Sequence, residues 1–201
     1  MEEWKGNLKK FWHFVWEEDS FWSWVVNIIL AFVLIKYIVY PGLGYTLNTS
    51  HPVVAVVSES MEHNGNLDDW WQKAGRWYTF NNIKKEDFGK FPLTGGFDKG
   101  DIIVLKGKSP ENIKIGDVIV FWSAKQDPII HRVVKKWQEN GVYYFQTKGD
   151  NNPDSIKSPG LDETRTSQDK IIGNAAFRIP LLGYIKIWFV EMLDFLRSTI
   201  A

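Results

Sequence analysis

The chain contains no cysteine among its 201 residues, which excludes disulfide bonds, thiolate metal sites and cysteine nucleophiles. It also lacks an excess of either charge, because 24 Lys and Arg balance 24 Asp and Glu for a formal net charge of +0. A nucleic-acid-binding protein normally carries a basic surface, and no run of five like charges supplies one here. Nucleic acid is therefore not expected as a partner.

Recognisable metal-ligand spacings are also missing. The sequence has four histidines and no HExxH motif, and without cysteine a zinc site is not expected. We therefore expect no metal and no cofactor. The four histidines are His13, His51, His63 and His131.

What the chain does have is tryptophan, 11 residues of it, and one long apolar run. Tryptophan concentrates at membrane interfaces, where its ring and its N–H are both satisfied. Phe21 to Tyr40 is apolar except for Ser23, Asn27 and Lys36. About 20 helical residues cross a hydrocarbon core of roughly 30 Å. This length favours a membrane anchor at residues 21–41 over a buried core helix, and the run is too long for a cleaved signal peptide.

Lysines give the anchor a direction. Lys5, Lys9 and Lys10 precede it, whereas residues 42–72 contain no Lys or Arg. The positive-inside rule therefore places the N-terminus in the cytoplasm and the rest of the chain outside, in a single-pass arrangement.

Two flanking segments are expected to be helical. In residues 1–20 the apolar side chains recur at helical spacing, which predicts a cytoplasmic amphipathic helix lying in the interface. Residues 183–201 mix apolar residues with four charges, which favours an interfacial or packing helix, with a truncated second span as the alternative.

Residues 42–182 are expected to form an antiparallel β-sheet or barrel-like domain, so that the fold class is mainly β. Short runs rich in β-branched and aromatic residues are separated by turn residues, and no helix–strand alternation suggests a parallel sheet. The runs are 52–57, 101–106, 117–122, 129–137 and 142–148.

An insertion at residues 61–96 interrupts the strand pattern. It is rich in aromatic residues, and residues 67–77 could form a short helix. We expect it to pack on itself and cover one end of the barrel, because aromatic side chains more often pack than bind. A membrane-dipping or substrate-guiding loop is the alternative.

Three segments could together form a hydrolytic site. Ser58 and Ser60 follow the apolar run 52–57, His131 interrupts an apolar strand, and Asp150 and Asp154 lie on a turn after 142–148. A serine nucleophile needs a base, and the base needs a group that holds its tautomer. Singly, each residue has a structural explanation: a surface serine, a hydrogen-bonded core histidine, or turn-forming aspartates.

The same segments, in the same order, resemble the type I signal peptidases of the archaeal and endoplasmic-reticulum branch, in which His replaces the Lys of the bacterial enzymes. The matching stretches are SESME at 58–62, IHRV at 130–133 and TKGDNN at 147–152, with GDVI at 116–119 and RIPLLGY at 178–184. The resemblance covers about Val53 to Tyr184 without the aromatic insertion.

This resemblance implies a serine endopeptidase that removes signal peptides from exported preproteins. It implies that Ser60 is the nucleophile, that His131 is the general base, and that Asp150 and Asp154 orient His131. The backbone N–H of Ser60 and the hydroxyl of Ser58 would form the oxyanion hole.

The implied partners are preprotein signal peptides, the lipid bilayer and possible accessory membrane subunits. The implied location is a cell membrane or an endoplasmic-reticulum-type membrane, with the catalytic domain on the extracytoplasmic side.

The sequence departs from the family at two positions. Glu59 stands where the family has a small residue; on a strand it would point away from Ser58 and Ser60. Ile156 stands where the family usually has an acid, so that Asp154 or Asp150 completes the triad or the triad is incomplete. These departures keep one alternative open, an inactive relative that binds preproteins or scaffolds a complex. The tryptophans of the insertion give a second alternative, an unrelated lipid- or polymer-binding module.

Overall fold

The structure is a computed structural model that describes residues 2–184, 187, 188 and 192. Most of the C-terminal helix expected at 183–201 therefore lies outside the described residues. The chain divides into two compact units, residues 1–46 and residues 47–201.

The first unit consists of two helical segments. Helix α1 (Glu2–Trp16) covers most of the segment expected to be amphipathic. A continuous helical run of 27 residues follows, made of α2 (Phe21–Leu34), the π-helical turn η1 (Ile35–Val39) and α3 (Tyr40–Leu47). This run is long and apolar enough to cross a bilayer.

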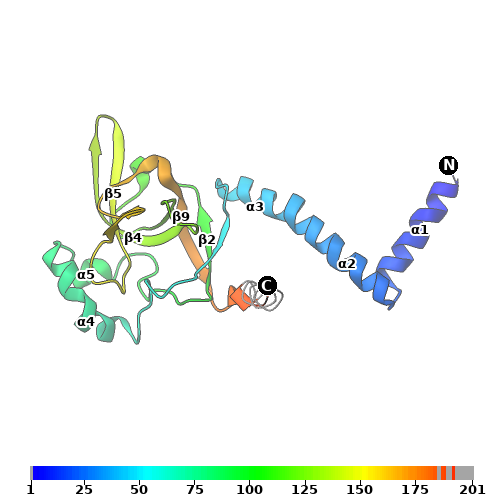
Figure 1. Cartoon of the computed structure of the whole chain (residues 1–201), viewed down its shortest axis with the longest axis horizontal. Coiled ribbons are helices and arrows are strands. Elements are labelled where there is room, and N and C mark those ends of the chain that lie inside the picture. The colour runs from blue at the N-terminus through cyan, green and yellow to red at the C-terminus, as the bar shows by residue number, and fades with distance from the viewer. Residues whose placement is uncertain (1, 185–186, 189–191, 193–201) are drawn as a thin grey trace. The chain divides into compact units, whose positions relative to one another are not determined.

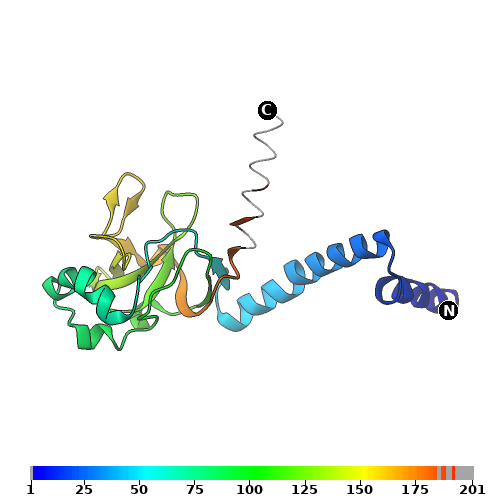
Figure 2. The ribbon, with the colours of Figure 1, turned by 90° about the horizontal axis from the view of Figure 1, so that it is seen from below.

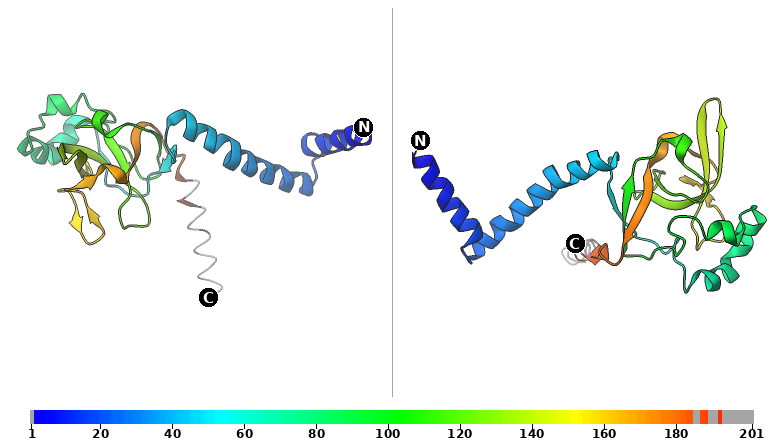
Figure 3. Two further views of the ribbon diagram at one scale, coloured as in Figure 1. Left: turned by 90° about the horizontal axis from the view of Figure 1, so that it is seen from above. Right: turned by 180° about the vertical axis from the view of Figure 1, so that it is seen from behind.

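Two polar residues of the apolar run donate hydrogen bonds to carbonyl groups at the end of α1. The Ser23 hydroxyl donates to the carbonyl oxygen of Phe14 at 2.7 Å, and the Asn27 amide donates to that of Val15 at 2.9 Å. The last carbonyls of a helix have no partner within it, so these side chains replace water at the bend between α1 and α2 (Figure 3).

The helix does not end at Pro41, where the sequence pattern predicts its end, but continues to Leu47. Proline has no N–H and its ring clashes with the carbonyl one turn earlier. The turn before it is π-helical, and the Tyr40 N–H bonds to Ile35, five residues back. This wider turn lets the helix pass the proline.

The second unit contains a seven-stranded antiparallel sheet with the order β1-β2-β9-β3-β4-β5-β8, which confirms the mainly β fold (Figure 1). The long β4–β5 hairpin, turning at Asn140 and Gly141, projects beyond its neighbours. The strands are β1 (Val53–Ala55), β2 (Ile102–Lys106), β3 (Val118–Phe121), β4 (Ile129–Glu139), β5 (Val142–Lys148), β8 (Thr166–Ser167) and β9 (Ile171–Ile179). A separate hairpin joins β6 (Lys157–Ser158) to β7 (Leu161–Asp162), and 3-10 turns lie at η2 (Pro110–Asn112) and η3 (Gln168–Lys170).

The sequence pattern does not predict β9, although β9 joins β2 to β3. Its sequence, IIGNAAFRI, is weakened as a strand signal by Gly173, Asn174 and two alanines. Bulges interrupt its pairing with both neighbours, and bulges increase the local twist of a sheet.

The sheet is buried on both faces around β3. Val118 and Val120 pack into one apolar cluster, with Met61, Phe97, Ile103 and Leu105 among its members. Ile119 and Phe121 pack into another, with Val133, Phe145 and Leu161. Because successive strand residues point to opposite faces, β3 is central to both cores.

The aromatic insertion folds into α4 (Leu67–Phe80) and α5 (Lys85–Phe88), which gather at one end of the domain (Figure 2). Asn66 caps α4 by accepting hydrogen bonds from the Asp68 and Asp69 N–H groups. The buried residues Trp70, Tyr78, Ile83 and Phe88 pack together against Val134 of β4. This agrees with a self-packed insertion.

Candidate active site

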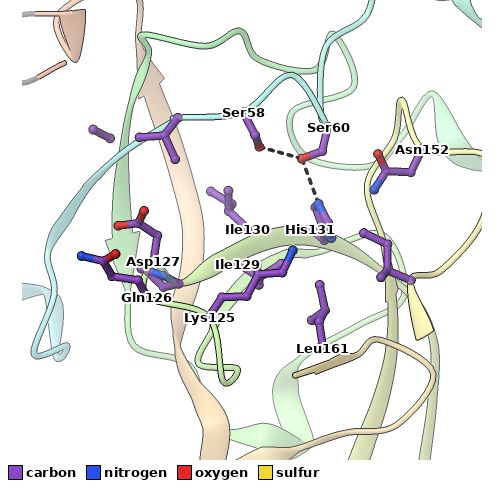
Figure 4. A pocket seen from close by; sticks show the side chains of 14 residues that line it. Ser58, Ser60, Lys125, Gln126, Asp127, Ile129, Ile130, His131, Asn152 and Leu161 are labelled. Atoms are coloured by element: carbon purple, nitrogen blue, oxygen red, sulfur yellow. Dashed lines mark hydrogen bonds between the residues drawn. The ribbon is translucent and has the colours of Figure 1, made fainter. Parts of the chain in front are cut away.

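Ser60 and His131 are in hydrogen-bond contact (Figure 4). His131 lies on β4, is 4% exposed, and places its Nε2 2.9 Å from the Ser60 Oγ. A histidine on an otherwise apolar strand is costly unless its ring nitrogens have partners. Here one nitrogen meets a hydroxyl that faces a cavity, which is the geometry of a nucleophile and its base.

Ser60 lies on a turn and not on a strand. The prediction that Glu59 points away from Ser58 and Ser60 because all three lie on a strand was therefore wrong in its premise. Strand β1 ends at Ala55, and residues 58–60 form a bend and turn in which the Glu62 N–H donates to the Glu59 carbonyl oxygen. The Glu59 side chain is nevertheless exposed and outside the cavity beside Ser60. The Ser58 hydroxyl lies 3.1 Å from the Ser60 hydroxyl.

The turn at residues 149–152 holds the Ser60 turn in place. The Asn151 N–H donates to the Ser60 carbonyl oxygen at 2.8 Å, and the Asn151 side-chain amide donates to that of Glu59 at 3.1 Å. The Asp150 N–H points at the Met61 sulfur at 3.3 Å. The segment TKGDNN therefore positions the serine, which the sequence pattern alone does not indicate.

Asp150 does not contact His131 among the described residues. Its fully buried carboxylate accepts hydrogen bonds from the Arg132 guanidinium at 2.7 and 2.9 Å, from the Tyr78 hydroxyl at 2.8 Å and from the His63 ring at 2.9 Å. Burial alone would raise the pKa of the Asp150 carboxyl, but Arg132 and His63 hold that pKa well below its ordinary value. Asp150 thus ties β4 to the aromatic insertion.

Asp154 is also separate from His131 in the part of the chain that the structure describes. It accepts hydrogen bonds from the Trp77 indole N–H at 2.8 Å and from the Ser155 N–H at 2.7 Å. The expectation that Asp150 or Asp154 orients His131 is therefore not met by the geometry. Asp150 is occupied by donors from β4 and the insertion, and Asp154 by donors from the insertion and its own turn.

The carboxylate that does contact His131 belongs to Glu163, which the sequence pattern does not single out. The His131 Nδ1 lies 2.5 Å from the Glu163 Oε1. Glu163 follows the short strand β7, within the polar stretch DETRT, and nothing in that stretch signals a buried carboxylate. The chain reverses direction in the β6–β7 hairpin, and this reversal places Glu163 beside His131 of β4.

An apolar cavity of about 350 Å³ opens beside Ser60 and His131. Its wall includes Ala55 and Val57 from the segment of β1, Ile129 and Ile130 from β4, and Ile156 and Leu161 near the β6–β7 hairpin. β1 is an edge strand of the sheet, so its free side can pair with an extended chain. The described residues hold no cluster of three His, Asp or Glu side chains that could bind a metal ion.

Removing the Arg132 guanidinium, which forms a buried ion pair with Asp150, is expected to destabilise the domain. Arg132→Met leaves the Asp150 carboxylate buried without its main partner, at a cost of about 3–5 kcal/mol in the free energy of unfolding. Arg165→Met is the matched control, since Arg165 pairs with Glu139 on the surface, at side-chain exposures of 48% and 45%, and its loss should lower the free energy of unfolding far less. Chemical denaturation in detergent measures both.

The loss of stability caused by Arg132→Met should shrink as the pH falls below about 4. Asp150 then becomes protonated in the unfolded state, while its lowered pKa keeps it ionised in the folded wild type. The stabilisation that this lowered pKa gives the wild type is lost as the pH falls further. Equal losses from Arg132→Met and Arg165→Met at neutral pH would contradict a stabilising role for the buried pair.

Comparison with known proteins shows the family of the chain. No family model matches the chain. It is 32% identical over 159 residues to the signal peptidase complex catalytic subunit SEC11 of Eremothecium gossypii, covering 77% of this chain and 75% of the relative. It is 30% identical to that of Schizosaccharomyces pombe and 29% identical to that of Saccharomyces cerevisiae, each over 83% of this chain and 82% of the relative. The chain therefore belongs to the family of signal peptidase complex catalytic subunits.

Proposed function

We propose that this chain is a membrane-anchored serine endopeptidase that cleaves signal peptides from preproteins, with Ser60 as nucleophile and His131 as general base. The observation that carries the proposal is the 2.9 Å contact between the Ser60 Oγ and the His131 Nε2 beside an apolar cavity. The relatives are named catalytic subunits, which favours an active enzyme over an inactive scaffold.

The chemistry follows from this contact. His131 takes the proton of Ser60 as the oxygen attacks the scissile carbonyl carbon, and then gives it to the leaving amine. The acyl-enzyme that remains is hydrolysed by a water molecule that His131 deprotonates in turn. The Ser60 N–H and the Ser58 hydroxyl, 3.1 Å from the nucleophile, are suited to stabilise the oxyanion of each tetrahedral intermediate.

The substrate binds, in this proposal, as an extended strand along the free edge of β1. Its side chain before the scissile bond would enter the cavity beside Ala55 and Ile130. The family resemblance implies small side chains there. An anchored enzyme meets such a substrate at the membrane surface, where the effective concentration of the two is high.

The proposed topology places residues 1–20 on the cytoplasmic surface, residues 21–41 in the membrane and the domain at 42–182 outside. Lys5, Lys9 and Lys10 support this orientation through the positive-inside rule. The membrane is of the endoplasmic-reticulum type or a cell membrane. The relatives are subunits of a signal peptidase complex, which supports accessory membrane subunits as partners of this chain.

The function is tested by incubating the detergent-purified chain with a preprotein and locating the cut by mass spectrometry. We expect one cut, at the signal-peptide junction. The same preprotein with Trp before the junction should be cut at least about 100-fold more slowly, since the family resemblance implies small side chains at this position. Equal cleavage of both substrates, or cuts elsewhere, would contradict the proposal.

Adding one methyl group at Gly149 is expected to damage the site without unfolding the domain. A Cβ at Gly149 would lie 2.8 Å from both the His131 Nε2 and the Ser60 carbonyl oxygen, closer than real contacts allow. Gly149→Ala should therefore displace the nucleophile and its base and lower kcat/KM about 100-fold. Gly95→Ala is the control, because a Cβ there meets nothing within 4 Å. A Gly149→Ala enzyme as active as the control would show that the two turns are not packed as tightly as described.

A further inference from the structure

Glu163 is a fully buried carboxylate whose two oxygens accept three hydrogen bonds. Its Oε1 accepts from the His131 ring at 2.5 Å and from the Thr147 hydroxyl at 3.0 Å, and its Oε2 accepts from the Ile156 N–H at 2.8 Å. Three donors on two oxygens favour the ionised form, because a protonated acid would have to turn a hydrogen toward one of them.

The contact with Glu163 determines which nitrogen of His131 faces the serine. A carboxylate only accepts hydrogen bonds, so the His131 Nδ1 must carry the hydrogen. The Nε2 is then left with a lone pair directed at the Ser60 hydroxyl. This is the tautomer that a base needs in order to take the proton of the nucleophile.

The segment that carries Glu163 closes on itself around the carboxylate. The Glu163 N–H donates to the Ile156 carbonyl oxygen at 2.9 Å, while the Ile156 N–H donates to the Glu163 side chain. Ile156 and Leu161, from the same segment, line the cavity beside Ser60. One short segment thus supplies both part of the cavity wall and the partner of His131.

We propose that Glu163 is the positioning residue of this active site, holding His131 in its productive tautomer and stabilising the imidazolium that forms during catalysis. The proposal rests on the proposed function, which it deepens. It accounts for Ile156 as well. The family usually has an acid at this position, but here the carboxylate that contacts His131 is supplied by Glu163, after the β6–β7 hairpin, so position 156 can be apolar.

Other charged groups surround this pair and remain the same in the test below. Lys148 on β5 interacts electrostatically with Asp150 and Glu163, and burial lowers the pKa of its ammonium to about 8. Asp150 is paired with Arg132, and Lys125 and Asp127 of the β3–β4 loop are among the residues that line the cavity.

The test compares Glu163→Gln with Thr147→Val in the full chain, using preprotein cleavage over a range of pH. Glu163→Gln keeps the size of the side chain and removes its charge; we expect kcat/KM to fall about 10³- to 10⁴-fold. The acidic limb of its pH profile should move down by at least about one pH unit, because the imidazolium loses its neighbouring anion. Thr147→Val removes a neutral donor from the same oxygen and should cost less than about 10-fold, with the limb unmoved.

A second readout does not depend on cleavage. The imidazole carbon-bound protons of His131, assigned with a His131→Ala sample, can be titrated by NMR in both variants, and the midpoint should move down in Glu163→Gln only. A wild-type chain that cleaves nothing would count against the proposed function, while the titration would still test Glu163. An unmoved midpoint, or equal losses in the two variants with unmoved limbs, would overturn the positioning role.

Discussion

Replacing Ser60 by alanine is expected to lower kcat for preprotein cleavage by roughly 10⁶-fold. The Ser60 Oγ is the atom that His131 contacts at 2.9 Å, and without it no acyl-enzyme can form. Substrate binding should survive, because Ser60 is only one of the many residues that line the cavity. Single-turnover cleavage by detergent-purified Ser60→Ala and wild type, at equal substrate occupancy, measures the effect.

Ser58→Ala is the matched control for this experiment. It removes a hydroxyl 3.1 Å from the nucleophile but leaves the nucleophile itself, so a loss of only about 10²- to 10³-fold is expected. If Ser60→Ala retained activity while Ser58→Ala lost it, the assignment of the nucleophile would have to move from Ser60 to Ser58.

Replacing His131 by alanine is expected to have an effect of the same size. Ser60 and His131 act as a unit, so the double variant should be no slower than either single variant. The matched control is His51→Ala, since the His51 ring hydrogen-bonds the neighbouring Ser50 hydroxyl, packs edge-on against the Trp122 ring and does not line the cavity. Additive losses in the double variant would show that the two residues contribute independently, which would contradict a nucleophile–base pair.

His131 is buried, so stability has to be measured beside activity. The thermal unfolding midpoint of His131→Ala should stay close enough to that of the wild type for the protein to be folded at the assay temperature. Unfolding at that temperature would instead support a core histidine whose hydrogen bonds serve the fold.

The parts of this protein that local sequence determines were predictable. The long apolar helix, a candidate membrane span, follows from an apolar run of the right length, and five of the strands follow from β-branched and aromatic runs between turn residues. Ser60 and His131 were predictable as a pair only through the order of the family segments, since 71 residues separate them in the chain.

The parts that depend on long-range packing were not predictable. β9 contains Gly173 and Asn174, which disfavour a strand, yet tertiary pairing with β2 and β3 makes it one. Asp150 looked like an orienting acid because no pattern shows that Arg132 and His63 occupy it. Glu163 was missed because a glutamate in a polar turn is ordinarily solvated, and only the β6–β7 hairpin buries it against His131.

The most direct test of the central claim is covalent capture of the nucleophile. A signal-peptide-derived phosphonate, which forms a stable bond to an activated serine oxygen and expels a phenol, can be incubated with the purified chain and the modified residue located by mass spectrometry. We expect modification of Ser60 in the wild type, none in Ser60→Ala, and at least about 100-fold slower modification in His131→Ala, because the base no longer activates the hydroxyl. Modification of another residue, or equal rates in all three proteins, would contradict a Ser60–His131 active site.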